Sequence, residues 1–248
     1  MTRLEELLEK TSRTFALSIP VLPEPTRRQV MLAYLLFRIA DTFEDAAHWP
    51  PARRIEALRE FQGLLSGYSR EEAARLAARW TAAGPSPDPG YGELIADVPL
   101  VLETFFALDR EAVSSVRAHV LRSAEGMAGF VERSREGVLA LNDVADLRAY
   151  CYAVAGIVGE MLTDLFLLGR EALAGTAPSL RERAPAFGEA LQLVNILKDT
   201  ATDVAEGRSF LPRAVSRSEI FALARRDLGT AREYTLALQR AEIGRAHV

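Results

Sequence analysis

One stretch of the sequence, residues 192–203, places polar and acidic side chains at helical intervals. Its members are Gln192, Asn195, Asp199 and Asp203. At 3.6 residues per turn these side chains share one helix face, which puts the two carboxylates about 6 Å apart along the axis. Carboxylates stacked in this way repel each other unless a cation lies between them. The spacing therefore favours a cation-binding helix face.

A second acidic stretch, with Asp41, Glu44 and Asp45, closes a strongly apolar segment far upstream. These three acids also share a helix face. Brought together, the two faces would form a site of oxygen ligands only, which suits a hard divalent cation such as Mg²⁺ bridging a phosphate-bearing substrate. The alternative for either stretch is a solvated helix end. For the upstream acids, the apolar helix that they follow and Arg38 on the same face argue against it. For Asp199 and Asp203, the amides at 192 and 195 argue against it because they add little to helix stability.

Basic side chains accompany both acidic stretches. Arg38 lies inside the apolar segment, where a buried guanidinium needs an anion. A substrate diphosphate or a neighbouring carboxylate would serve, and both readings stay open. Lys198 and Arg208 add positive charge beside the second stretch, and Arg208 follows Gly207, where the chain can fold back over a bound anion.

The composition is that of an ordinary globular protein. Of 248 residues, 49% are hydrophobic and 26% charged, and the net charge of -4 gives no reason to expect nucleic acid binding. The single cysteine, Cys151, excludes an internal disulfide and indicates a cytoplasmic setting. The N-terminus lacks the apolar core of a signal peptide. Glu160 and Asp164 interrupt the longest apolar run, which argues against a membrane span.

Helical periodicity dominates the chain, so we expect one all-α domain over residues 1–241. Asp143 and Asp146 are typical of a helix start, and Ser216 with Glu219 forms a capping box. Residues 84–90 have the composition of a loop. Helices are expected over 26–46, 52–65, 71–82, 93–108 with a break at Pro99, 109–134 and 144–169, followed by the helix bearing Asp199 and one after Ser216.

The last helix stops without a cap in the segment 242–248. This heptapeptide is what a common sequencing adapter encodes when it is read through in frame. We expect it to be a non-native tail on a truncated reading frame, and we expect the natural protein to be longer.

Tyr150 opens an apolar run with small residues at intervals, among them Gly156 and Gly159. Small residues indicate tight helix packing, and they also leave room for a long apolar ligand beside a tyrosine hydroxyl. The two readings are compatible. The histidines have no Glu-x-x-His spacing, which argues against a di-iron bundle, and no phosphate-binding loop, nucleophile elbow or zinc spacing is present.

Taken in order, these residues resemble the squalene/phytoene synthase family, the head-to-head branch of the isoprenyl diphosphate synthases. The resemblance covers about residues 11–212 and is closer to squalene synthases than to phytoene synthases. It rests on the ordered motifs Ser12-Arg13-Thr14-Phe15, Tyr34 with Arg38, Asp41-Thr42-Phe43-Glu44-Asp45, Gly126-Met127-Ala128, Tyr150-Cys151, Val154-Ala155-Gly156, Gln192 with Asn195, Asp199 and Asp203, and Gly207-Arg208.

The resemblance implies an all-α isoprenoid synthase fold, with acidic clusters facing each other across the mouth of a central apolar cavity. It implies Mg²⁺ as cofactor and farnesyl diphosphate as substrate. The implied Mg²⁺ ligands are Asp41, Asp45, Asp199 and Asp203, helped by Glu44 and Asn195. The implied substrate contacts are Arg13, Tyr34, Arg38, Gln192, Asn195, Lys198 and Arg208. Lys198 stands where relatives often have arginine, which keeps the charge and loses the bidentate fork.

By the same resemblance, the expected reaction joins two farnesyl diphosphates to presqualene diphosphate and squalene, with Tyr150 steering proton loss and NADPH serving the reductive second step. Phytoene or dehydrosqualene synthesis is the alternative reaction, and a non-catalytic diphosphate-binding subunit is the alternative of another class. We expect a monomer in the cytoplasm that associates transiently with the membrane for product release.

Overall fold

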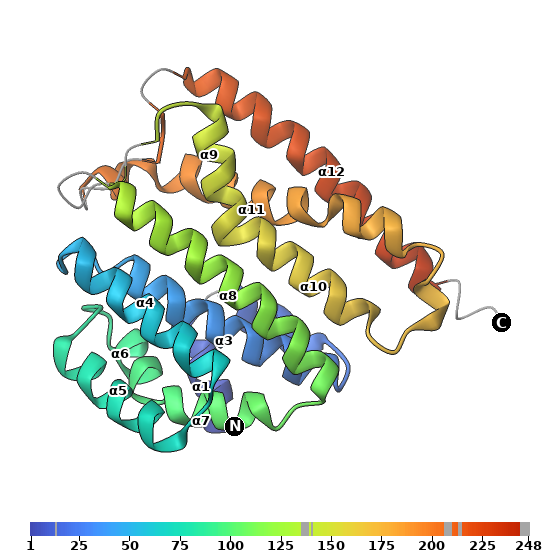
Figure 1. Ribbon diagram of the computed structural model, residues 1–248. Coiled ribbons are helices and arrows are strands. Elements are labelled where there is room, and N and C mark those ends of the chain that lie inside the picture. The colour runs from blue at the N-terminus through green and yellow to red at the C-terminus, as the bar shows by residue number, and fades with distance from the viewer. Residues whose placement is uncertain (13, 135–138, 140, 206–209, 213–214, 244–248) are drawn as a thin grey trace. The chain divides into compact units, whose positions relative to one another are not determined.

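The computed structural model describes residues 1–12, 14–134, 139, 141–205, 210–212 and 215–243; for residues 172, 200–205 and 240–243 it describes the backbone alone. Within these ranges every regular element is a helix (Figure 1), which confirms the all-α prediction. The contacts within the chain divide it into two compact units, Met1–Glu132 and Arg133–Val248. We call these the first and the second unit. The single domain over 1–241 stays a prediction.

The first unit contains eight α-helices among its described residues. They are α1 (Arg3–Thr11), α2 (Phe15–Ser18), α3 (Thr26–Glu44), α4 (Pro51–Ser66), α5 (Arg70–Ala83), α6 (Pro89–Ala96), α7 (Val98–Phe106) and α8 (Arg110–Arg133), with the short 3₁₀ turn η1 (Ile19–Val21).

Helix α3 forms the centre of the first unit, as its apolar sequence predicts. Val30, Leu32 and Leu35 lie on different sides of this helix and are buried. Helices α1, α4, α6 and α7 all pack against it. A helix that is apolar all round is stable only when neighbours cover every face, so the packing of α3 fixes the position of the acidic residues at its C-terminal end.

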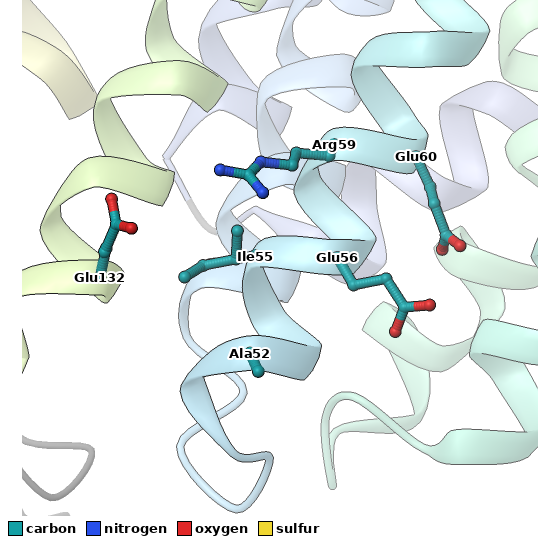
Figure 2. Close-up of a pocket in the computed structure, with 6 residues that line it drawn as sticks. All are labelled: Ala52, Ile55, Glu56, Arg59, Glu60 and Glu132. Carbon is teal, nitrogen blue, oxygen red and sulfur yellow. The ribbon is translucent and has the colours of Figure 1, made fainter.

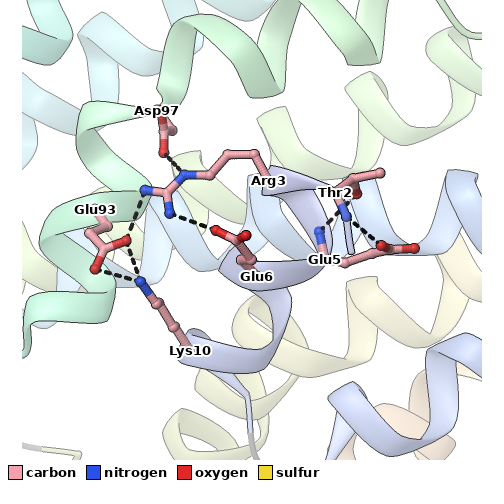
Figure 3. Close-up of polar contacts among 7 residues, drawn as sticks. All are labelled: Thr2, Arg3, Glu5, Glu6, Lys10, Glu93 and Asp97. Atoms are coloured by element: carbon pink, nitrogen blue, oxygen red, sulfur yellow. Dashed lines mark hydrogen bonds and ion pairs between the residues drawn. The ribbon is translucent and has the colours of Figure 1, made fainter.

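A network of charged side chains fixes α6 on α1 (Figure 3). Arg3 pairs with Asp97 at 2.7 Å and with Glu93 at 2.8 Å. Lys10, two turns along α1, pairs with the same Glu93 at 2.7 Å. Where the helices meet, a Cβ at Gly90 would lie 2.9 Å from the backbone carbonyl oxygen of Lys10. The start of α6 therefore lies directly against the α1 backbone.

The expected helix over 93–108 is in fact two helices, and it starts earlier. Asp88 accepts a hydrogen bond from the Gly90 N–H at 2.8 Å, and Pro89 occupies the first helical position. Proline is well placed there because that N–H has no partner inside a helix. The break falls at Asp97, just before Pro99, close to where the sequence predicts it.

In the second unit, α9 (Val144–Cys151) runs through a π-helical turn, η2 (Tyr152–Gly156), into α10 (Ile157–Leu167). Asp143 caps α9 by accepting a hydrogen bond from the Asp146 N–H at 2.9 Å, as expected. The sequence predicts one continuous helix over 144–169, and the π turn is a difference from it. The short 3₁₀ turn η3 (Glu171–Leu173) comes next.

Helices α11 (Ala177–Ala205) and α12 (Arg217–Ile243) complete the second unit. The capping box at the start of α12 is confirmed, because Ser216 N–H donates to the Glu219 carboxylate at 2.9 Å and Glu219 N–H donates to Ser216 Oγ at 3.3 Å. Helix α12 extends two residues into the segment 242–248, of which 244–248 lie outside the described residues.

The continuous helical segment Val144–Leu167 is long and apolar enough to cross a bilayer, judged by length and composition alone. Half of its apolar window is buried inside the protein. Core helices of globular proteins pass the same test, so this segment is weak support for a membrane span.

Glycines let α11 approach the segment before it at backbone distance. A Cβ at Gly188 would collide with the carbonyl oxygen of Ala155, and one at Gly159 would collide with that of Ala184. Both obstacles are backbone atoms, which cannot rotate away. The tight-packing reading of Gly159 is therefore confirmed.

We predict that Gly188→Ala lowers the free energy of unfolding by about 1–3 kcal/mol, because the added methyl group forces two helices apart. Gly229→Ala is the matched control on α12, where a Cβ meets nothing within 4 Å. That change should raise stability by up to about 1 kcal/mol through helix propensity. Urea unfolding followed by circular dichroism measures both, and equal effects of the two substitutions would contradict the packing interpretation.

Candidate functional site

The acidic stretch of the first unit spans the last turn of α3. Asp41 is partly exposed, Asp45 is exposed, and the Glu44 side chain is buried at 7% exposure. The three carboxylates therefore lie in different surroundings although they are close in sequence. Glu44 points toward the protein interior, which fits a supporting role better than a ligand at the surface.

Asp41 has an unusual electrostatic environment. Burial raises the pKa of its carboxyl group to about 6; Arg38 pulls that pKa down, and the neighbouring Asp45 carboxylate pushes it up. A nearby cation would stabilise the ionised form of this carboxylate, because it would offset both the lost hydration and the repulsion from Asp45.

Arg38 lies at the centre of this region, in contact with one acid and two aromatic rings. Its Nη1 is 3.5 Å from Asp41 Oδ2, and its Nε donates a hydrogen bond to Tyr34 Oη at 3.3 Å. The guanidinium carbon lies 5.5 Å from the centre of the Tyr34 ring and 5.7 Å from that of Tyr91. Burial opposes the charge, but Asp41 and the two tyrosines outweigh it, so the pKa of Arg38 lies above its usual range.

Tyr34 is itself held by α1 and α2. Its hydroxyl donates a hydrogen bond to the Thr11 backbone carbonyl at 2.6 Å, and the ring of Phe15 lies 5.5 Å away. The carboxylate alternative for Arg38 is thus realised through Asp41, at a distance that leaves a weak ion pair. A substrate anion as a further partner stays a prediction.

Two residues near this site escaped the sequence analysis. Tyr91 lies in a Pro-Gly-Tyr-Gly segment just before the predicted helix start at 93. Arg54 on α4 is buried and donates a hydrogen bond from Nη2 to the Glu44 carbonyl oxygen. A positive charge at this end of α3 is favourable because the helix dipole places negative charge there. The only sequence signal for either was its place next to a helix start rich in proline.

In the second unit, the predicted polar stripe lies on α11. Asn195 and Asp199 are exposed and Gln192 is half-buried, while Lys198 is exposed beside them. This arrangement fits a face that can reach a ligand. The backbone of residue 203 continues the same helix, and the side chain of Asp203 is outside the described residues.

Tyr150 lies on α9, with its side chain buried and its ring stacked on Phe210 at 5.1 Å. Cys151 beside it is also buried, and burial raises the pKa of this thiol far above its usual value. A thiol in that state is unreactive. Of these two neighbouring residues, Tyr150 is therefore the candidate for a chemical role.

A charged triad ties the helix of Tyr150 to both long helices of the second unit. Arg148 on α9 pairs with Glu189 on α11 at 3.0 Å and with Asp227 on α12 at 3.5 Å. Both carboxylates are at least nine-tenths buried, so burial raises the pKa of each, and Arg148 only partly reverses this. Two buried acids share one guanidinium.

Among the described side chains, no group of three or more His, Cys, Asp or Glu residues lies close enough to hold a metal ion unaided. Asp41 and Asp45 are oxygen donors whose mutual repulsion a divalent cation would relieve, so they fit half of the predicted Mg²⁺ site. Asp199 belongs to the other unit, and the facing arrangement of the two acidic stretches stays a prediction.

Three predicted site residues cannot be assigned a place. Arg13 and Arg208 lie outside the described residues, as does the side chain of Asp203. Their predicted roles stand unchanged.

A pocket of about 500 Å³ in the first unit contains none of the predicted site residues (Figure 2). Its Arg59 side chain extends toward α8, from which Glu132 projects, whereas Glu56 and Glu60 point away. Glu60 is already engaged by Arg79 and by the Trp80 indole N–H at 2.9 Å. The Glu60 carboxylate therefore joins α4 to α5. The lining residues are Ala52, Ile55, Glu56, Arg59, Glu60 and Glu132.

The second unit has a larger apolar groove of about 760 Å³ between α11 and α12. Phe221 and Leu228 of α12 line it and are 52% and 42% exposed, and Val194 and Lys198 of α11 form its other side. Lys198 is the one predicted site residue on it.

Comparison with known proteins gives consistent matches. A family model described as squalene/phytoene synthase matches residues 8–248. Squalene synthase ERG9 of Candida albicans is 31% identical over 215 residues, covering 87% of this chain and 46% of that protein. Squalene synthase ERG9 of Saccharomyces cerevisiae is 31% identical over 210 residues, covering 85% and 45%. The chain thus spans about half the length of the curated relatives it matches.

Solved structures agree with this. The complex of TcSQS with the ligand E5700 is 27% identical, with a TM-score of 0.69 over 85% of this chain and 57% of that one. A dehydrosqualene synthase in complex with ligand has a TM-score of 0.58 over 95% of this chain and 74% of that one. At 22% identity the second match shows the fold alone.

We predict that Arg148→Leu destabilises the protein by about 2–3 kcal/mol at pH 7, because two buried carboxylates lose their counter-charge. Burial raises both carboxyl pKa values in the folded state. Their contribution to stability is therefore complete below the unfolded pKa of about 4 and is lost as pH rises through the folded values. The defect should shrink as the pH is lowered toward 4.

The control is Glu189→Gln, which leaves one acid for one guanidinium and should weaken the pH dependence. Urea midpoints between pH 4 and 8 measure all three proteins. If Arg148→Leu is equally destabilising at every pH, Arg148 does not stabilise the protein by neutralising the two buried carboxylates.

Proposed function

The chain belongs to the squalene/phytoene synthase family, and on that premise we propose that it is a Mg²⁺-dependent prenyltransferase that joins two farnesyl diphosphates head-to-head. The product is presqualene diphosphate and then squalene. The observation that carries this proposal is the end of α3, where Arg38, with its raised pKa, lies beside an acid whose pKa is raised to about 6. A metal–diphosphate pair would satisfy both groups.

The proposed reaction begins with cleavage of an allylic C–O bond, which leaves diphosphate and a carbocation. Mg²⁺ would neutralise the charge that develops on the leaving group. The proposed ligands are Asp41, Asp45, Asp199 and Asp203, with Glu44 and Asn195 in support. The buried position of Glu44 suits it to orient Asp41 or Asp45 rather than to bind the ion itself.

The basic residues would hold the diphosphate while the bond breaks. Arg38 already stands next to Asp41, so it could donate hydrogen bonds to a diphosphate oxygen while Asp41 would help to hold the Mg²⁺ that neutralises the same group. Arg13, Lys198 and Arg208 are proposed as further contacts. Preformed positive charge of this kind accelerates the reaction because it needs no rearrangement as the charge develops. Tyr34 and Gln192 would contact the substrate beside them.

Tyr150 is proposed to steer proton loss as the cyclopropyl intermediate forms. Its buried position against Phe210 supports this, since a hydroxyl removed from water can act on a carbocation without admitting water to quench it. Phe15, Leu36 and Val154 are proposed to line the central apolar cavity that the resemblance implies. The Leu36 side chain is fully buried in the first unit.

Squalene is proposed before dehydrosqualene or phytoene because the curated relatives at 31% identity carry the name squalene synthase. The reductive second step would require NADPH. A non-catalytic diphosphate-binding subunit is disfavoured because binding alone does not require two acidic stretches and a buried tyrosine. We propose a cytoplasmic monomer that meets the membrane only to release its apolar product.

We predict that the protein converts farnesyl diphosphate to presqualene diphosphate in the presence of Mg²⁺, and to squalene when NADPH is added. Mass spectrometry of the extracted products, with NADPH present or omitted, makes the measurement. Geranylgeranyl diphosphate supplied in parallel should give no C40 product. Phytoene from that substrate would move the assignment to the alternative reaction, and dehydrosqualene from farnesyl diphosphate would do so too.

Replacing either Asp41 or Asp199 by asparagine should lower the rate of product formation at least about 100-fold, because each removes one charge from the proposed Mg²⁺ site. Glu182→Gln is the matched control, since Glu182 lies on the same helix as Asp199 and its side chain is 81% exposed. The control should keep its full rate. A wild-type rate in Asp199→Asn would remove α11 from the metal assignment.

A further inference from the structure

Arg38 has two aromatic neighbours, and only one of them belongs to a recognised motif. Tyr34 is on the same helix, one turn before Arg38. Tyr91 comes from α6, and its ring centre lies 5.7 Å from the guanidinium carbon, almost as close as that of Tyr34 at 5.5 Å. The side chain of Arg38 thus lies between rings supplied by two different helices.

The position of Tyr91 is set by its immediate neighbours. Gly90 lies against the Lys10 backbone, where a larger residue would have to displace it. One turn along α6, Glu93 is held by both Arg3 and Lys10, and Figure 3 shows these side chains converging from α1. The helical turn that carries Tyr91 is therefore held against α1 on both sides, at Gly90 and at Glu93.

The two rings can restrain the Arg38 side chain without competing with a bound anion, as a second carboxylate would. A free arginine side chain has about 2 kcal/mol of rotamer entropy to lose when it binds an anion. Aromatic faces attract the guanidinium and limit its motion without adding a negative charge that would compete with the anion. Asp41, at 3.5 Å, is too distant to fix the guanidinium by itself.

We propose that Tyr91 is a positioning residue, whose ring holds the Arg38 guanidinium against Tyr34 in the orientation that binds diphosphate. The identity of the anion rests on the proposed function, whereas the hold on Arg38 does not. Tyr68 provides the contrast within the same unit, because its ring stacks on Phe106 at 5.0 Å and neither residue belongs to the proposed site.

The first test needs no ligand. In ¹⁵N-resolved NMR of the full chain, the Arg38 Nε–H signal, assigned by its loss in Arg38→Lys, should be ordered in the wild type and in Tyr91→Phe. It should become motionally averaged in Tyr91→Leu and stay ordered in Tyr68→Leu. An Arg38 signal that is unchanged in Tyr91→Leu would overturn the proposal.

The second test measures the affinity for inorganic pyrophosphate in the presence of Mg²⁺ by calorimetry. Tyr91→Leu should weaken it by about 2- to 30-fold, the range of a single cation–π contact. Tyr91→Phe and Tyr68→Leu should leave it within about 2-fold of the wild type. In an Arg38→Gln background, Tyr91→Leu should have no further effect, because the group that it positions is absent.

An equal loss in the Arg38→Gln background would show that Tyr91 acts through general packing, and would overturn the proposal. A wild type that binds no pyrophosphate would overturn the proposed function instead. In that case the NMR measurement still decides whether Tyr91 holds Arg38.

Discussion

A guanidinium largely withdrawn from water constrains the first unit more than any other group. Arg38 cannot give up its proton, so its surroundings must compensate for the lost hydration. They do so with one carboxylate, one hydroxyl and two rings, drawn from α3 and α6, while α1 supports Tyr34. The central place of α3, the close contact at Gly90 and the charged network of Figure 3 all serve to bring these groups together.

The second unit solves a different problem, which is to hold a tyrosine rigidly on a helix that is not a regular α-helix. The π turn η2 begins two residues after Tyr150 and shifts the register of α10 relative to α9. Such turns interrupt the regular hydrogen-bond pattern of an α-helix and are often found at functional sites. Here Gly188 of α11 packs against the backbone of this turn, and the Arg148 triad fixes the helix just before it. The irregular turn is thus supported on both sides.

Much of this architecture is encoded in local sequence. The burial of α3, the cap at Asp143, the capping box of Ser216 and the close packing at Gly159 are consequences of spacing within one turn or one helix. The contacts that escaped prediction join distant segments: Tyr91 with Arg38 across 53 positions, and Arg148 with Asp227 across 79. Periodicity carries no information on which helix covers which, so these pairs needed coordinates.

The raised carboxyl pKa values of the two units have the same cause and different meanings. Burial is the largest contribution for Asp41, Glu189 and Asp227 alike. Glu189 and Asp227 already share a guanidinium and are only 7% and 10% exposed, so the cost of their burial is a cost of folding. Asp41 is 28% exposed. Because it is accessible, its unfavourable state can be relieved by an incoming cation, and the free energy released then strengthens binding. Access to solvent, rather than the size of the shift, separates a carboxylate that can bind a ligand from one that holds helices together.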